Sequence, residues 1–531
     1  MLGDNSSNYL RTSGKNISYW IDSTEPIFYE KLNRNINAEV AIIGGGISGI
    51  TTAYLLSKEK VNVALIEDGF IGSGETGRTT AHIVNVLDDR YFDLEKTFNE
   101  KEAALAAESH TQAINFIDSI VKEEKIDCDF QRLDGYLFLH PTDKEENLQK
   151  EFSAASRAGL NVSFADQVPG IKSVHTPALK FPNQAQFHPL KFLRSLCGKI
   201  IEQGGKIFTQ THADEISGKV IKASGGFLIN AGNIVVATNT PISTRFAIHT
   251  KQFPYRTYVI ACKIPKGTLP KALWWDTGDH SSAWFTLPYH YVRLQDYNTN
   301  YDLLIAGGED HKTGQADKEE IPEDERYKNL YDWTKEHFPN AGEVLYHWSG
   351  QVIEPMDSLA FIGKDPTAEN VYLVTGDSGN GITHGTLAGS ILNDLILGRK
   401  NKFSELYDPS RKNLSSASVY IKEQLNVAAQ YADLFSKGDV ENLKDLLSGN
   451  GAVIRYQLNK IAVYRDETGK YNFFSAICPH LKCVVQWNND EKTFDCPCHG
   501  SRFSCYGKVI NGPANKDLEV FESEKIKEER T

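Results

Sequence analysis

The sequence of 531 residues has no basic excess, no tandem repeat and no low-complexity tract. Its 57 Lys and Arg residues are outnumbered by 69 Asp and Glu residues, which gives a formal charge of −12. Because a surface of this sign repels polyphosphates, we expect no nucleic-acid partner. The composition, with 40% apolar and 24% charged residues, is that of a folded globular protein and excludes a disordered or fibrous chain.

Long hydrophobic runs are also scarce. The most apolar uncharged stretch, residues 40–57, is interrupted by four glycines at positions 44, 45, 46 and 49. A membrane-spanning helix needs about 20 apolar residues, so a nucleotide-binding turn explains this stretch better. The first twenty residues have no apolar core of the signal-peptide type. We therefore expect no membrane span and a cytoplasmic location.

Cysteines are few and unevenly placed. The chain has eight, and five of them lie between positions 478 and 505: Cys478, Cys483, Cys496, Cys498 and Cys505. In a chain for which no export signal is expected, such clustering favours metal or redox chemistry over structural disulfides.

Composition and hydrophobic pattern divide the chain into four parts. Residues 1–38 form a polar extension with a few aromatic side chains. Residues 39–400 alternate strand and helix patterns, and within them residues 94–125 predict one charged amphipathic helix. Residues 401–445 are polar and helical, as in a linker, and residues 446–531 contain short alternating strands, glycine turns and the cysteine cluster. The pattern predicts two functional units joined by the linker.

A glycine turn opens the first unit. Gly44, Gly46 and Gly49 match the G-x-G-x-x-G pattern between an apolar strand and a helix, and Glu67 follows at the end of the next strand. In such a turn the glycines allow a tight bend and a close approach of backbone to a pyrophosphate. The helix N-terminus then faces the phosphates, and the acidic residue accepts hydrogen bonds from ribose hydroxyls. Ser48 lies within the same turn. The pattern predicts a dinucleotide site, and by itself leaves FAD and NAD open.

Two further loops of small residues favour FAD. Residues 72–82 would let the backbone approach a flavin edge, and residues 376–385 would direct amides at the N1/O2 side of a reduced flavin. The candidate cofactor-binding residues in these loops are Thr76, Arg78, Thr79, Thr80, Gly376, Gly379, Gly381, Ile382 and Thr383.

Together these motifs resemble the FAD-dependent D-amino-acid oxidase family, near glycine oxidase and sarcosine oxidase. The resemblance covers about residues 39–400. It implies a Rossmann-like α/β FAD-binding domain of the glutathione-reductase type with an antiparallel-sheet substrate domain, FAD in an extended pose, and oxidation of a C–N bond by hydride transfer. The FAD-binding segments would be about 39–125, 188–240 and 360–400, and the substrate domain about 126–187 and 241–359.

One departure from that family concerns the substrate. In the family an arginine near the last substrate-domain strand holds the substrate carboxylate, whereas the corresponding residues 348–355 here contain none. Arg256 and Arg293 are the alternatives, although each is equally explained as a structural arginine. The substrate expected is therefore an amine or amino-acid derivative, and a simple amino acid is in doubt.

The C-terminal cysteines alternate with histidines in two boxes. Cys478-Pro479-His480 with Cys483 is followed by Cys496-Pro497-Cys498-His499. Two cysteines and two histidines also suit zinc, but the spacing is not that of a zinc finger. The boxes resemble the Rieske [2Fe–2S] family over about residues 446–531, which implies an all-β domain. By that resemblance Cys478 and Cys496 hold one iron, His480 and His499 hold the other, and Cys483 and Cys498 form a disulfide.

Other residues of these boxes bear on the reduction potential. Ser501 and Phe503 occupy the positions where high-potential Rieske proteins carry a serine and a tyrosine, whose hydroxyls donate to the cluster. Phe503 has no hydroxyl, so we expect a potential below that of respiratory Rieske proteins. Gly512-Pro513-Ala514 matches the loop that covers the cluster, and Cys505 is expected to be a free thiol.

Two enzyme classes are disfavoured. Rieske oxygenases need a mononuclear iron with two nearby histidines, yet outside the boxes no two histidines are closer than ten positions, as at 280 and 290. Pyridine-nucleotide reductases carry a second glycine-rich dinucleotide turn, and none is seen here.

The leading hypothesis is a dehydrogenase with a built-in electron relay. An amine-type substrate would reduce FAD, and electrons would pass singly through the [2Fe–2S] cluster to a quinone, a cytochrome or a small carrier protein. The alternatives are a reductase or O₂-activating flavoenzyme supplied through the cluster, and a redox sensor. No residue stands out as an obligatory acid or base. Weak candidates for the flavin pocket are Tyr258, Gln351 and His384.

Overall fold

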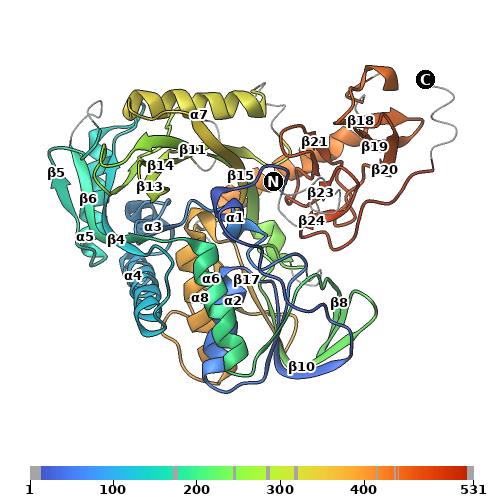
Figure 1. Ribbon diagram of the computed structural model, residues 1–531, viewed down its shortest axis with the longest axis horizontal. Coiled ribbons are helices and arrows are strands. Elements are labelled where there is room, and N and C mark those ends of the chain that lie inside the picture. The colour runs from blue at the N-terminus through green and yellow to red at the C-terminus, as the bar shows by residue number, and fades with distance from the viewer. Residues whose placement is uncertain are drawn as a thin grey trace.

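The computed structural model describes residues 14–171, 177–242, 247–282, 287–315, 321–413, 417–435, 438–440 and 442–522. A larger body contains two sheets, and a smaller domain built from the last strands lies beside it, in orange and red in Figure 1. No helix in the described part of the chain is both long and apolar enough to cross a membrane.

The first sheet is mainly parallel and carries the glycine turn. Its order is β16 (Phe361–Lys364), β17 (Val371–Thr375), β10 (Leu228–Val236), β1 (Ile36–Ile43), β2 (Val63–Ile66) and β7 (Lys206–Phe208), with the hairpin of β8 (Ala213–Ser217) and β9 (Val220–Ala223) beside β10. Only β16 and the hairpin run antiparallel to their neighbours among these described strands. Both faces are buried, because Ile42 and Leu65 pack under helices while Ile43 and Ile66 pack on the opposite side.

Helices cover one face of this sheet. They are α2 (Ile47–Lys58), α4 (Glu100–Glu123), α6 (Pro189–Glu202) and α8 (Gly381–Ile396), as Figure 1 shows. The single helix expected over residues 94–125 is in fact two, α3 (Tyr91–Thr97) and α4. Asn99 is the reason, because its side-chain oxygen accepts a 3.0 Å hydrogen bond from the amide of Glu102 and caps α4. A short helix, α5 (Glu145–Arg157), packs against α3 and α4.

The second sheet is largely antiparallel. Its order is β15 (Val344–Pro355), β11 (Gln252–Pro265), β14 (Tyr301–Lys312), β13 (Tyr291–Asp296), β12 (Leu273–Asp276), β4 (Gln131–Phe138), β6 (Ala178–Gln186) and β3 (His82–Ile83), with β5 (Ser163–Ala165) beside β6. Helix α7 (Glu323–His337) covers one face (Figure 1). Because side chains alternate along β11, Tyr258 and Ile260 pack under α7, and Val259 and Ala261 face the other way.

The N-terminal extension is tied to the larger body through helix α1 (Tyr19–Asp22). Trp20 is fully buried, and its indole N–H donates a 2.6 Å hydrogen bond to the carbonyl of Thr79. The hydroxyl of Ser18 donates to the carbonyl of Gly77. The extension therefore fixes the backbone of the loop 72–82.

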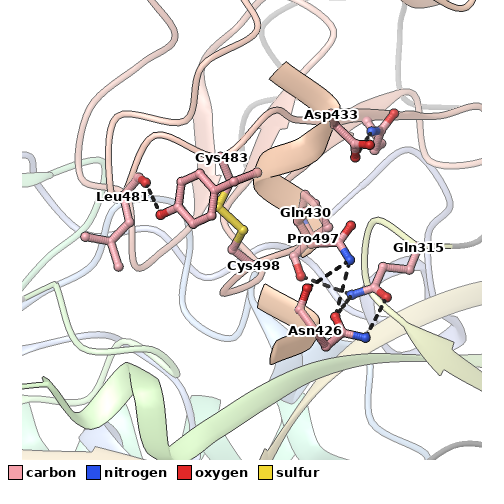
Figure 2. The surroundings of a disulfide bond; sticks show 10 residues. Gln315, Asn426, Gln430, Asp433, Leu481, Cys483, Pro497 and Cys498 are labelled. Atoms are coloured by element: carbon pink, nitrogen blue, oxygen red, sulfur yellow. Dashed lines mark hydrogen bonds between the residues drawn. A yellow bond between two sulfur atoms is a disulfide. The ribbon is translucent and has the colours of Figure 1, made fainter. Parts of the chain in front are cut away.

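The C-terminal domain consists of two small antiparallel sheets. One contains β18 (Asn450–Tyr456), β19 (Asn459–Arg465) and β20 (Tyr471–Ser475), and the other contains β21 (Gln486–Asn488), β22 (Thr493–Asp495), β23 (Arg502–Ser504) and β24 (Val509–Asn511). The preceding segment forms α9 (Ala417–Gln430) and a short 3-10 helix (Tyr431–Phe435). This segment packs on both domains. Gln315, which follows β14, donates to Asn426 of α9 at 3.1 Å (Figure 2), and the hydroxyl of Tyr431 donates to the carbonyl of Leu481 in the C-terminal domain at 2.6 Å.

The two domains are joined by a buried carboxylate. Glu491, from the turn between β21 and β22, is fully buried, and its Oε1 lies 3.0 Å from the guanidinium of Arg78 and 3.2 Å from that of Arg256. The amide of Asn16 donates to its Oε2 at 3.0 Å. Ser349 of β15 donates to the same carboxylate through its amide and its hydroxyl. Because two desolvated cations depend on one anion, we expect this contact to dominate domain docking.

Replacing Glu491 by Gln tests that expectation. The change leaves Arg78 and Arg256 without their counter-ion, which we expect to destabilise the docked arrangement by about 3 kcal/mol. Calorimetric unfolding and hydrogen exchange at the amide of Ser349 measure the effect. The matched control is Asp517→Asn, which removes a carboxylate of the same domain that is 42% exposed in its pair with Lys508. We expect it to change stability by less than about 1 kcal/mol. Equal changes in stability for the two substitutions would contradict the expectation that Glu491 dominates domain docking.

The same carboxylate gives the docking a pH dependence. Burial by itself raises the pKa of Glu491, but Arg78 and Arg256 outweigh burial and hold the pKa at about 2. A depressed folded-state pKa contributes stability that is present above the unfolded value of about 4.3 and is lost as the pH falls through the folded value. We therefore expect protection at Ser349 to be lost between about pH 4 and pH 2 in the wild type. Glu491→Gln removes the group that titrates, so identical pH profiles for the two proteins would contradict this origin.

Candidate functional site

The glycine turn has the geometry that its sequence predicts. Gly44 follows β1 with φ +112°, and a Cβ there would lie 2.2 Å from the carbonyl oxygen of Ala237. A Cβ on Gly49 would lie 2.0 Å from the carbonyl oxygen of Gly44. Side chains are therefore excluded at both positions, and α2 begins directly after the turn at Ile47.

Glu67, at the end of β2, holds this turn in place. Its Oε2 accepts a 2.6 Å hydrogen bond from the amide of Gly45, and its Oε1 accepts one of 2.8 Å from the amide of Gly69. Burial raises the pKa of this carboxyl to about 6, and the two amides partly offset that rise. The side chain also lines the adjoining cavity, where the sequence predicts a ribose contact.

One continuous cavity runs from the glycine turn to the antiparallel sheet. Of the predicted cofactor-binding residues, those that line it are Gly44, Gly46, Ser48, Glu67, Thr76, Arg78, Thr79, Thr80, Gly379, Gly381 and Ile382. Gly49, Gly376 and Thr383 are not among its described lining residues. Gly49 serves the packing of the turn, and the hydroxyl of Thr383 lies 2.8 Å from the ring of His110. The segments 44–49, 72–82 and 376–385 thus meet at one cavity.

These residues fit FAD. The first residues of α2 and of α8 both line the cavity, so two helix N-termini direct their positive ends at it. Such ends favour a diphosphate and the electron-rich edge of a reduced flavin. When bound there, FAD supplies a two-electron acceptor that can release its electrons one at a time.

Of the three weak catalytic candidates, Gln351 lines the cavity. Tyr258 does not, because it alternates with Thr257 and Val259 along β11 and faces α7, where its ring packs 4.9 Å from that of Tyr327. His384 points into the helical layer, with its Nδ1 2.7 Å from the carbonyl of Asp377. The structure therefore offers Gln351, and neither Tyr258 nor His384, to a bound substrate or cofactor.

The two arginines considered for a substrate carboxylate are engaged elsewhere. Arg256 bonds to Ser349 and Glu491. Arg293 is fully buried, and its guanidinium donates to the carbonyls of Ala81 and Phe187 at 3.0 Å. Among the described lining residues of the cavity, Arg78 is the single Arg or Lys, and its charge is paired with Glu491. Among the described residues, no other arginine takes the place of the one that residues 348–355 lack.

Carboxylates line the cavity instead. Asp88, Asp310, Glu354 and Asp377 all border it. Burial raises the pKa of Asp310 and of Asp377 to about 7, and that of Glu354 well above its usual value. No sequence pattern indicates this group, because its members come from four separate segments and none belongs to a recognisable motif.

The predicted cluster ligands converge in the C-terminal domain. The thiols of Cys478 and Cys496 lie within hydrogen-bonding distance of each other, and the rings of His480 and His499 are 5.1 Å apart between centroids. Burial lowers the pKa of each imidazole to about 4, so both are neutral at pH 7, as ligands must be. The donor set of two thiols and two imidazoles fits a [2Fe–2S] cluster of the Rieske type.

A disulfide ties the two boxes together. Cys483 and Cys498 are bonded, with their Cα atoms 6.5 Å apart, which is the pairing that the Rieske resemblance implies (Figure 2). The Sγ of Cys496 lies within 4.8 Å of both sulfurs. Cys505 is a buried free thiol, as expected.

Ser501 connects the cluster to its covering loop. Its hydroxyl donates to the sulfur of Cys478 and accepts a 2.9 Å hydrogen bond from the amide of Ala514. Phe503 is fully buried and offers no hydroxyl.

The C-terminal domain forms part of the cavity wall. Val509, Ile510, Asn511, Gly512, Ala514 and Asn515 of the C-terminal domain line the cavity. Gln351 of β15 donates a 3.0 Å hydrogen bond to the carbonyl of Gly500, the neighbour of His499. Asn511 donates to Glu75 in the loop 72–82 at 3.0 Å. His249 packs against both cluster histidines, with ring centroids 5.0 Å from His480 and 6.5 Å from His499. No pattern within either domain indicated these contacts.

Comparison with known proteins agrees with this geometry. Residues 39–395 match the FAD dependent oxidoreductase family, and residues 436–522 match the Rieske [2Fe-2S] domain. The Bacillus subtilis protein YhfW, whose name describes a Rieske 2Fe-2S iron-sulfur protein, is 31% identical over 95% of this chain and 97% of its own. Gamma-glutamylputrescine oxidoreductase of Escherichia coli is 24% identical over 71% of this chain and 87% of its own.

A similar fold is found among solved structures. Glycine oxidase from Geobacillus kaustophilus superposes with a TM-score of 0.58 at 18% identity, over 71% of this chain and 99% of that enzyme. From the matched family, the shared two-domain architecture and the convergence of the site residues, the chain belongs to the FAD-dependent oxidoreductases of the D-amino-acid oxidase type and carries a C-terminal Rieske [2Fe–2S] domain.

Proposed function

We propose that the protein is a dehydrogenase that oxidises the C–N bond of an amine and passes the electrons through its own Rieske cluster to an external acceptor. The observation that carries the proposal is the shared wall of the two sites. Residues 509–512 of the cluster domain line the cavity that holds the glycine turn. A cluster domain that served an unrelated reaction would not need to form part of the flavoprotein cavity.

The reaction balances with FAD and an outside oxidant. The substrate loses a hydride from carbon and a proton from nitrogen and becomes an imine, which water then hydrolyses. The two electrons leave one at a time to two equivalents of a one-electron acceptor, or to one quinone. An enzyme that gives its electrons to O₂ directly has no use for a one-electron relay, so the cluster favours a quinone, a cytochrome or a small carrier protein.

Gln351 lies where the two sites meet. Its backbone amide donates a 2.7 Å hydrogen bond to Glu75 in the loop 72–82, and its side-chain amide donates to Gly500 beside His499. Gln351 is thus connected to the predicted ligand His499 by one hydrogen bond to Gly500 and by the short stretch of backbone between Gly500 and His499. A packed contact of this kind suits intramolecular electron transfer.

The relatives support an amine-type substrate. One is a gamma-glutamylputrescine oxidoreductase, and the structural neighbours include glycine oxidase and L-amino acid deaminase of Proteus vulgaris. These enzymes act on compounds with a C–N bond to be oxidised.

The deciding experiment uses purified holoprotein without oxygen. A panel of amines and amino acids is added, and flavin absorbance and the EPR signal of the reduced cluster are followed by rapid mixing. We expect one substrate class to bleach the flavin first and to produce the cluster signal afterwards. A flavin that no member reduces, together with a cluster that accepts electrons from an outside protein donor, would contradict the proposal and favour reversed flow or redox sensing.

Removal of a cluster ligand separates the two half-reactions. In Cys496→Ser we expect flavin reduction by substrate to persist and electron delivery to a one-electron dye to fall at least about 100-fold, because a ligand is lost. Cys505→Ser is the matched control, since it changes a buried cysteine of the same domain that is not a predicted ligand. Undiminished delivery in Cys496→Ser would show that electrons bypass the cluster.

The hydroxyl of Ser501 is expected to tune the cluster. Because it donates to the sulfur of Cys478, it stabilises the reduced and more negative state. A hydrogen bond of about 1 kcal/mol corresponds to about 40 mV in a one-electron couple, so Ser501→Ala should lower the potential by that amount. An EPR-monitored redox titration measures the shift. Ser504→Ala is the control, since its hydroxyl accepts from the amides of Tyr506 and Lys508 instead. A potential that does not fall in Ser501→Ala would refute the role.

A further inference from the structure

The cavity carries an acidic wall that the general reaction does not explain. Asp88 follows β3, Asp310 belongs to β14, Glu354 to β15, and Asp377 follows β17, and all four border the cavity. Asp88 accepts a hydrogen bond from the hydroxyl of Tyr289, and Glu354 accepts from the hydroxyl of Ser378. These residues are brought together only by folding, so they are not the solvated face of one helix.

Three buried carboxylate or amide oxygens along the cavity have no donor among the described residues, and Oδ1 of Asp377 is one of them. The Oε1 of Gln351, a residue only 4% exposed, accepts no hydrogen bond from the residues that the structure describes, and neither does Oδ1 of Asp310. Both residues line the cavity. A buried acceptor without a partner is unfavourable, so a bound molecule that donates N–H groups would satisfy both.

Positive charge near this wall is already committed. Arg90 donates to the carbonyls of Leu87 and Asp276, and His290 lies 2.9 Å from Asp276 and 3.4 Å from Glu309. Arg90 lowers the pKa of Asp88, and His290 lowers that of Asp310. Burial nevertheless dominates and leaves both pKa values raised, that of Asp310 at about 7. The described cations therefore do not compensate these carboxyl groups, and a bound cation would favour their ionised form.

Aromatic side chains complete this part of the cavity. They are Tyr255, Trp275, Tyr289 and Tyr291. Aromatic rings pack well on a methylene chain, and their faces attract an ammonium group. An alkyl chain with cationic ends would meet both features.

On the basis of the proposed function, we infer that the substrate is an alkyl diamine or polyamine without a carboxylate on the oxidised carbon. Asp310 and Asp88 hold its distal ammonium group. Gln351 accepts a hydrogen bond from the amine that is oxidised. The same wall repels the α-carboxylate of an amino acid, which finds no uncommitted arginine among the described lining residues.

Substrates of matched length test this assignment. The holoprotein is mixed anaerobically with 1,4-diaminobutane, 1-aminobutane or 2-aminopentanoate, and the rate of flavin reduction is measured against concentration. We expect the ratio of the limiting reduction rate to the apparent Kd to be at least about tenfold higher for the diamine than for the monoamine, as for a charged hydrogen bond, and the amino acid to be the slowest. An amino acid that reacts as fast as the diamine would overturn the inference.

Asp310→Asn tests the residue. We expect it to raise the apparent Kd of the diamine at least about tenfold and to bring its ratio of reduction rate to Kd close to that of the monoamine, because the distal charge has lost its partner. Asp332→Asn is the matched control, since it removes an exposed carboxylate of α7 that pairs with Lys328. An unchanged diamine preference in Asp310→Asn would overturn the role, and Asp88→Asn repeats the test if Asp310→Asn does not fold.

A binding measurement keeps this inference separate from the proposed function. Isothermal titration of 1,4-diaminobutane into wild-type holoprotein that has first been reduced measures affinity without turnover, and we expect Asp310→Asn to weaken it at least about tenfold. If amino acids reduce both flavin and cluster while the diamine does not bind, the inference fails and the proposed function stands. If the diamine binds but no amine reduces the flavin, the proposed function fails instead.

Discussion

The buried carboxylate of Glu491 is the contact on which the arrangement of the two domains depends. It lies against Arg78 of the loop 72–82 and Arg256 of β11, and the amide of Asn16 brings the N-terminal extension to the same point. Three charged groups removed from water are stable only together, because each alone would carry a large desolvation penalty. We therefore expect the two domains to dock cooperatively. Residues of the segment 509–515 line the cavity in this docked arrangement.

This use of arginine has a consequence for the substrate. A guanidinium at the cavity could have held a substrate carboxylate, but the charge of Arg78 is directed at Glu491 and Arg256 lies on the opposite face of its strand. With both committed to domain docking, the ionisable side chains that remain beside the antiparallel sheet include the carboxyl groups of Asp88, Asp310 and Glu354. Because Arg78 and Arg256 pair with Glu491, they hold the cluster domain in place and leave these carboxyl groups of the cavity without either arginine as a partner.

The sequence predicted what short-range spacing determines. The turn at Gly44 and the ligand boxes at Cys478 and Cys496 need particular residues a few positions apart, so their patterns suffice to place them. The contact between Arg78 and Glu491 joins residues 413 positions apart, and nothing local marks either one. The acidic wall was not predicted for the same reason, because its carboxyl groups come from separate segments. Two details could have been predicted from local sequence and were not. Asn99 is a typical N-cap residue and divides the helix, and the alternation of side chains along β11 directs Tyr258 away from the cavity.

The orientation of the cluster domain also bears on the direction of electron flow. The two predicted histidine ligands face the flavoprotein domain, where His249 packs against their rings and Gln351 bonds to Gly500. In the first box, Leu481 remains 45% exposed on the outside. The side of the cluster domain that faces the cavity is therefore packed, and an external partner would meet the domain at its outer surface. The proposed direction of electron flow, from the cavity to an external acceptor, is compatible with this arrangement, because the internal contact is buried whereas the outer surface is open.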